Sequence, residues 1–267
     1  MTDDRHRLLQ CLKGGAVRHA THAVLLVGIV ATLGLQAGCT GPSASETRDK
    51  AEFHYKLSNG HFYASEIVPA LGELETCLRL VPDHPDAHHL MGFIFFGRKE
   101  YARAEGHFRK ALTVRKGFHQ ARANLGALLL ATRRWREAVT ILEPLVGATL
   151  YPTPWVTYNN IGLAWEKMGR PKQALKNYRL AVFHNAKFCQ AYNNLGGLHA
   201  QLGHDADAID FLLQAAEKCQ KFADPHYRLG EIFARQGRHA DARRQFDSCF
   251  KDAPQTPTGR LCRRRMM

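Results

Sequence analysis

The sequence lacks the short motifs that mark common catalytic and cofactor sites. It contains no GxxxxGK(S/T), GxGxxG or GxSxG pattern, so nothing signals a phosphate loop, a dinucleotide site or a serine nucleophile. CxxC and HExxH are also absent, which argues against zinc sites of the common types despite fifteen histidines. We therefore expect no enzyme activity, no cofactor, no metal ion and no small-molecule substrate.

A hydrophobic run long enough to cross a membrane is also missing. The main apolar stretch, residues 23–35, reads AVLLVGIVATLGL, whereas an ordinary transmembrane helix needs about 20 apolar residues. A polar, basic segment precedes it, and Gln36-Ala37-Gly38-Cys39 follows it. This order is typical of a secretory signal. We predict that residues 1–38 are a signal peptide and take no part in the fold.

The end of this segment, LQAGC, resembles a bacterial lipobox. The resemblance implies that Cys39 receives a diacylglycerol and becomes the first mature residue. Gln36 departs from the aliphatic residue usual at that place, so a plain signal peptide or an uncleaved anchor stays open as the alternative. Thr40 stands where an Asp usually signals inner-membrane retention, which implies the outer membrane. Residues 39–50 are small and polar, and we expect a flexible, lipidated tether.

The chain is basic, with a formal net charge of +13 over 267 residues. Such a surface favours acidic proteins, anionic lipid headgroups or nucleic acid, although it also fits an ordinary solvated surface. A short basic tail, residues 257–267, ends the chain. We expect a solvated end there rather than a nucleic-acid arm, because an exported protein rarely meets nucleic acid.

The strongest pattern is an internal repeat of about 34 residues. A glycine recurs at 34, 36, 34 and 34 residues, and an alanine follows each glycine twelve residues later. The glycines are Gly92, Gly126, Gly162, Gly196 and Gly230, and the alanines are Ala104, Ala138, Ala174, Ala208 and Ala242. Large apolar residues recur around them. Three places after each glycine stand Phe95, Leu129, Trp165, His199 and Phe233.

This pattern resembles the tetratricopeptide repeat, which implies an all-α, right-handed superhelical solenoid of helix-turn-helix units. Small residues allow the two helices of a unit to approach, and stacked units bury the apolar faces that no unit buries alone. We place six units within residues 51–256. They are 51–84, 85–118, 119–154, 155–188, 189–222 and 223–256, the third with two extra residues.

In such arrays the first helix of each unit lines the inner surface, so inner positions are candidates for partner binding. These positions hold Asn59, Asn124, Asn159, Asn160, Asn193 and Asn194. A side-chain amide both donates to and accepts from a peptide backbone, although part of this asparagine pattern belongs to the repeat itself. Phe93 and Phe96 fall on the same face and would form either an apolar docking patch or a packing contact with the next unit.

Five cysteines lie within or after the repeats, in a chain that we expect to be exported. Cys189 opens the fifth unit and Cys219 closes it, and these two ends of a helical hairpin are neighbours. Cys249 and Cys262 would join the tail to the last helix. We predict these two disulfides, and we expect Cys77 to be free at a small core position.

Six repeats after a lipobox resemble the pilotin lipoproteins of type IV pili, the PilF, PilW and Tgl group. Leu150-Tyr151-Pro152, followed by Asn160-Ile161-Gly162-Leu163, is similar to the junction between the third and fourth repeats of that family. The resemblance implies an outer-membrane protein that binds secretin subunits and promotes their assembly into the pilus pore. The alternative is a general envelope scaffold, for example for peptidoglycan enzymes.

Overall fold

The computed structural model describes residues 43–148 and 151–267, which form one compact unit. Within these residues there are thirteen helices and no strand. Twelve of the helices form six consecutive pairs, which we call repeats 1 to 6. The pairs are α2 (Ala44–Tyr63) with α3 (Ile67–Leu80), α4 (Pro85–Gly97) with α5 (Tyr101–Val114), α6 (His119–Ala131) with α7 (Trp135–Val146), α8 (Pro154–Lys167) with α9 (Pro171–His184), α10 (Cys189–Gln201) with α11 (Asp205–Lys218), and α12 (Ala223–Arg235) with α13 (His239–Asp252).

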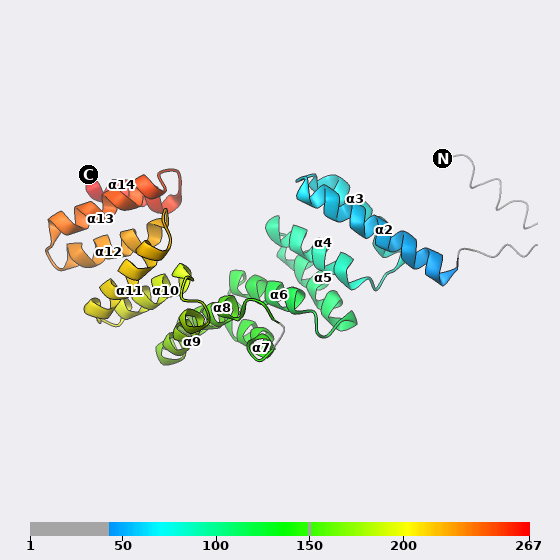
Figure 1. Ribbon diagram of the computed structural model, residues 1–267, viewed down its shortest axis with the longest axis horizontal. Coiled ribbons are helices and arrows are strands. Elements are labelled where there is room, and N and C mark those ends of the chain that lie inside the picture. The colour runs from blue at the N-terminus through cyan, green and yellow to red at the C-terminus, as the bar shows by residue number, and fades with distance from the viewer. Residues whose placement is uncertain (1–42, 149–150) are drawn as a thin grey trace, which may run out of the picture. The chain divides into compact units, whose positions relative to one another are not determined.

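The pairs stack in sequence order. The two helices of each repeat pack together, and the second helix packs against the first helix of the next repeat. The first helices α4, α6, α8, α10 and α12 also contact one another in succession. Figure 1 shows this order as a colour gradient that runs from α2 to α14 without a helix returning to an earlier repeat. The all-α tetratricopeptide solenoid predicted from the sequence is therefore confirmed.

The repeating glycine has a definite packing role. A Cβ atom built on Gly126 would lie 2.3 Å from Leu142 Cδ2, and one built on Gly196 would lie 2.5 Å from Leu212 Cγ. Gly92, Gly162 and Gly230 meet Phe108, Tyr178 and Phe246 in the same way. Each glycine thus makes room for the large side chain four residues after the repeating alanine, and the core of each repeat forms around that contact.

Each hairpin turn contains one residue in the left-handed backbone region. These residues are Ser65, Lys99, Arg133, Gly169, Gly203 and Gly237, with φ between 60° and 78°. Glycine adopts this conformation without steric cost, whereas a residue with a Cβ atom is strained there. The hairpin turns of repeats 4 to 6 are therefore relaxed and those of repeats 1 to 3 are strained, and a further strained residue, Lys221 with φ 65°, lies in the turn between repeats 5 and 6.

Two of the expected segment boundaries are corrected by the structure. The predicted tether, residues 39–50, is helical from Ala44 onward, because Ser43 and Glu46 form a capping box that starts α2. The predicted solvated tail, residues 257–267, contains the helix α14 (Pro257–Met266). Thr256 caps this helix, Thr258 Oγ1 donates to Asp224 Oδ1 at 2.8 Å, and Arg265 forms an ion pair with Glu231.

Both predicted disulfides are present in the structure. Cys189 is joined to Cys219 across the open end of the α10–α11 hairpin, and Cys249 of α13 is joined to Cys262 of α14. Cys77 is free and buried, and burial raises the pKa of its thiol to about 11. The predicted signal peptide and Cys39 lie outside the described residues. Among the described residues, no helix combines the length and apolar character needed to cross a membrane.

Candidate functional site

A hollow of about 510 Å³ lies along the first helices of repeats 1 to 3 and the start of repeat 4. Its walls come from α2, α4, α6, the loop before α8, and α8 itself. The lining residues are Tyr55, Asn59, Phe62, Tyr63, His89, Leu90, Phe93, Gln120, Ala123, Asn124, Tyr151, Pro152, Thr153 and Val156. Because four successive repeats contribute, this surface is long enough to hold a peptide segment rather than a single small group.

Aromatic side chains give the hollow its apolar character. Phe62 of α2 and Phe93 of α4 pack edge to face, with ring centroids 5.8 Å apart and an interplanar angle of 79°. Phe93 is 42% exposed and the neighbouring Tyr63 is 81% exposed. Large aromatic residues held this far out of the core are typical anchors for a partner protein.

Polar groups between the aromatics are ordered by bonds within the protein. Asn124 Nδ2 donates to His89 Nε2 at 2.9 Å, and Asn59 Nδ2 donates to the Tyr55 carbonyl oxygen at 3.1 Å. Burial lowers the pKa of His89, an effect that nearby Asp86 opposes and Arg115 reinforces. The imidazole is therefore neutral near pH 7 and accepts the amide proton. The two amide oxygens remain as acceptors for a partner's backbone.

The loop that carries the two extra residues of the third repeat completes the hollow. Tyr151 is buried, its hydroxyl oxygen accepts from Thr157 Oγ1 at 3.2 Å, and its ring lies edge to face with His119. Pro152 and Thr153 then lie on the wall of the hollow. The insertion is thus part of the candidate site.

The other predicted inner-face residues lie elsewhere. Asn159 and Asn193 are buried, with exposed fractions of 6% and 2%. Asn194 Nδ2 donates to Asn159 Oδ1 at 2.8 Å, and Asn194 Oδ1 accepts from Gln190 Nε2 at 3.1 Å. This amide chain connects repeats 4 and 5, so it stabilises the stack instead of facing a partner. Asn160 is half-buried beside it.

Of the predicted inner-face residues, the structure brings together Asn59, Phe93 and Asn124 in the hollow. Phe96 does not line it, because its ring packs beside Tyr101 at 6.0 Å. Sequence reasoning missed Tyr55, Tyr63 and His89. Tyr55 and His89 occupy the fifth place of their units, so the rule that selected the asparagines would have found both, but Tyr63 had no comparable signal.

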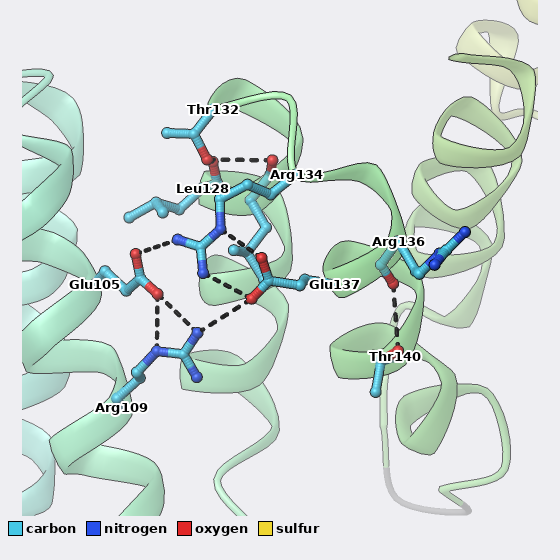
Figure 2. Close-up of polar contacts among 9 residues, drawn as sticks. Glu105, Arg109, Leu128, Thr132, Arg134, Arg136, Glu137 and Thr140 are labelled. Carbon is cyan, nitrogen blue, oxygen red and sulfur yellow. Dashed lines mark hydrogen bonds and ion pairs between the residues drawn. The ribbon is translucent and has the colours of Figure 1, made fainter. Parts of the chain in front are cut away.

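An ion-pair network on the second helices fixes the spacing of repeats 2 and 3 (Figure 2). Arg134 Nη1 donates to Glu105 Oε2 at 2.5 Å, and the same guanidinium donates twice to Glu137. Arg109 joins the network through Glu105. Burial raises the pKa of Glu105, but the hydrogen bonds from the two arginines outweigh it and the pKa is lowered. The network therefore stays charged at neutral pH and links α5 of repeat 2 to the start of α7 in repeat 3.

Comparison with known proteins agrees with this fold. Residues 160–223 and residues 226–256 each match a family model described as the tetratricopeptide repeat. The protein is therefore a tetratricopeptide-repeat solenoid, a fold that serves as a protein-interaction scaffold.

One similar protein by sequence and two similar solved structures are named for type IV pilus biogenesis. The chain is 29% identical over 168 residues to the type IV pilus assembly protein PilF of Pseudomonas aeruginosa, and the match covers 62% of this chain and 66% of PilF. The crystal structure of PilW, a widely conserved type IV pilus biogenesis factor, has a TM-score of 0.70 at 19% identity, covering 79% of this chain and 97% of PilW. The structure of Pseudomonas aeruginosa PilF has a TM-score of 0.68 at 20% identity, covering 83% and 98%.

Proposed function

We propose that this protein is a type IV pilus pilotin, which binds secretin subunits through the aromatic hollow and promotes their assembly into the pilus pore. The similarity to PilF supports the pilus assignment. The hollow supports the binding role, because it is the concave apolar surface that an interaction scaffold needs and it extends over four repeats.

The chemistry of the hollow favours an extended or helical protein segment with apolar side chains. Phe93 on α4 and Tyr63 at the end of α2 both expose apolar surface in the hollow. A side chain of the partner that is inserted between them would be removed from water. Asn59 and Asn124 line the same hollow, and their amide oxygens would accept from the backbone that carries this side chain. The aromatic residues would supply most of the affinity, and the amides would fix the position of the bound segment along the hollow.

The lipid anchor is the second part of the proposal. Cys39, outside the described residues, would carry acyl chains that hold the repeats at the periplasmic side of the outer membrane. More than one chain gives stable attachment, because each buried methylene contributes about 0.8 kcal/mol. Replacing Cys39 by alanine should release the protein from the membrane fraction, and recovery of this variant with the membranes would contradict the anchor.

The binding role is tested by capture from solubilised outer membranes. Purified full-length protein should retain the secretin, detected by antibody. Tyr63→Ser and Phe93→Ser should weaken capture by roughly thirtyfold together, the size of a hot-spot loss of about 2 kcal/mol. Phe183→Ser is the matched control, because Phe183 is also 81% exposed but lies on α9, outside the hollow.

A deletion strain gives the second readout. Secretin multimers should be strongly reduced in the deletion strain and restored by the wild-type gene and by the Phe183→Ser gene. Normal amounts of secretin multimer in the deletion strain would contradict the proposed pilotin role. Capture of a peptidoglycan enzyme in place of the secretin, lost in the hollow variants, would instead support a general envelope scaffold.

A further inference from the structure

Two buried side chains in repeat 5 have polar atoms without a hydrogen-bond partner in the described part of the chain: Oδ1 of Asn193 and both ring nitrogens of His199. His199 is 5% exposed, and neither ring nitrogen makes a hydrogen bond. The other two buried histidines in the described residues are both satisfied. His84 accepts from the Ala87 backbone N–H and approaches Glu52, and His88 bonds His107 and the Pro82 carbonyl oxygen. A buried polar side chain without partners requires an explanation.

The repeat pattern makes this histidine more unusual. At the same place in the other repeats stand Phe95, Leu129, Trp165 and Phe233, which are all apolar. The ring of His199 packs beside Phe211 at 5.3 Å, so an apolar ring would fit the same space. Packing alone therefore gives no reason for two nitrogen atoms at this position.

Two further side chains that can bind a metal ion, His204 and Asp207, lie near the His199 imidazole. His204 begins the turn into α11, and Asp207 lies on the first turn of that helix. His199 Nδ1 lies 3.4 Å from Asp207 Oδ2, and one ligand atom from each of the three residues falls within 4.8 Å of the others. The His204 backbone N–H donates to the His199 carbonyl oxygen at 2.9 Å, which holds the two histidines at one end of the hairpin.

We propose that His199, His204 and Asp207 form a binding site for a divalent transition-metal ion of the zinc class. Two imidazoles and one carboxylate are ligands that zinc accepts, with a fourth position left for water or a partner's side chain. Ligand atoms about 2.0–2.1 Å from a tetrahedral ion lie roughly 3.3 Å apart, close to the His199–Asp207 separation. His204 is exposed and Asp207 is 63% exposed, so both have room to close on the ion.

The charges around the site are mixed. Burial lowers the pKa of His199, nearby Asp207 opposes this shift, and Arg179 of α9 and His204 reinforce it. A neutral His199 is the form that binds a metal ion. Arg179 opposes a cation, so the carboxylate of Asp207 is needed to offset it.

A bound ion would give repeat 5 a second closure. The Cys189–Cys219 disulfide joins α10 to α11 at the open end of the hairpin, and the proposed site lies at the turn end, where Gly203 makes the tight connection. The ion would therefore join the same two helices at their other ends. The expected consequence is a higher melting temperature in the presence of metal.

The test is titration of purified, oxidised full-length protein with Zn²⁺ and with Co²⁺, whose visible absorption reports the ligand geometry. We expect one ion per chain and a rise in melting temperature. His199→Phe should lower the affinity by at least about tenfold, the loss that even outer-shell changes cause. This variant carries the residue that repeats 2 and 6 have at the same place, so the fold should be retained.

Asp207→Asn should weaken the binding in the same way. His61→Gln is the control, because His61 forms an exposed pair with Glu66 at a helix end without a third ligand, and its affinity should equal that of the wild type. Equal affinity of wild type and a folded His199→Phe variant would overturn the site, as would a wild type that binds no ion. Cys77 adds no ligand, because it is buried in α3 of repeat 1 and the proposed site lies in repeat 5.

Discussion

Repeats 1 to 3 and repeats 5 to 6 are built on one plan but are held together differently. The later repeats have two disulfides and glycine at their hairpin turns. The earlier repeats have a free buried cysteine, strained turns at Ser65, Lys99 and Arg133, and the aromatic hollow. The comparison indicates a division of labour. The later repeats are held by covalent links, whereas the earlier repeats have strained hairpin turns and exposed aromatic rings in the hollow.

Removing a disulfide should change the difference in stability between the later and the earlier repeats more than any other substitution considered. Loss of Cys189–Cys219, which closes 30 residues of chain, should lower the free energy of unfolding by about 2–4 kcal/mol. The double variant Cys189→Ser/Cys219→Ser, followed by denaturant unfolding and hydrogen exchange, should show faster exchange in repeats 5 and 6 and little change in repeat 2. Equal loosening in repeat 2 would show that the two halves unfold as one.

The attachment of α14 depends on a glycine that contacts backbone. A Cβ atom on Gly259 would lie 1.9 Å from the Ala253 carbonyl oxygen, so Gly259→Ala must displace the helix and should cost about 1–3 kcal/mol. Limited proteolysis should then cut near residues 253–259. Gly97→Ala is the control, since nothing lies within 4 Å of its Cβ position, and protection of α14 in Gly259→Ala would disprove the contact.

Exchanging the turn residues tests whether strain differs between the halves. Lys99 has φ 63° and Gly237 has φ 73° at equivalent turns. Lys99→Gly should raise the free energy of unfolding by about 0.5–1 kcal/mol and Gly237→Lys should lower it by a similar amount, because a Cβ atom in this region is strained. Thermal melts of the two variants should shift in opposite directions, and shifts of the same sign would contradict the idea.

A further expected effect is a pH dependence of stability to which repeat 2 contributes. Its His88–His107 pair occupies the positions that hold His226 and Gln245 in repeat 6. Burial, with help from His88 and Arg103, lowers the pKa of His107 to about 4. The unfolded chain therefore binds this proton first as the pH falls. The stability due to a neutral His107 is complete above about pH 6.5 and is lost as the pH falls to about 4.

His107→Gln would install the pair that repeat 6 already has. We expect the melting temperature of this variant to fall less between pH 7.5 and pH 4.5 than that of the wild type. The equivalent substitution His226→Gln in repeat 6 serves as the control for general acid effects. An unchanged pH profile in His107→Gln would exclude His107 as the source.

Much of the fold could be predicted because the repeating residues are those that the packing within one helix pair requires. Gly126 and Ala138 predict a close helix pair from the sequence alone, and the cysteines at the two ends of repeat 5 predict a disulfide because a hairpin brings its ends together. The helix α14 was not predicted, since its partners Asp224 and Glu231 lie 34 residues away in the sequence. The early start of α2 could have been predicted from the capping box at Ser43 and Glu46. The small, polar composition of residues 39–50 instead suggested a flexible tether.

The sequence by itself determined the periodic part of this protein: six helix pairs, their register and the cysteines that meet. These features depend on residues within one unit, and the unit is short enough for its spacing to fix its geometry. Only the tertiary structure decided which inner-face residues face solvent. Asn124 and Asn194 hold the same place in their repeats, yet one lies in the hollow and the other bonds Asn159, because the choice depends on side chains of neighbouring repeats. The same holds for His199, whose missing partners are visible only when the surrounding helices are in place.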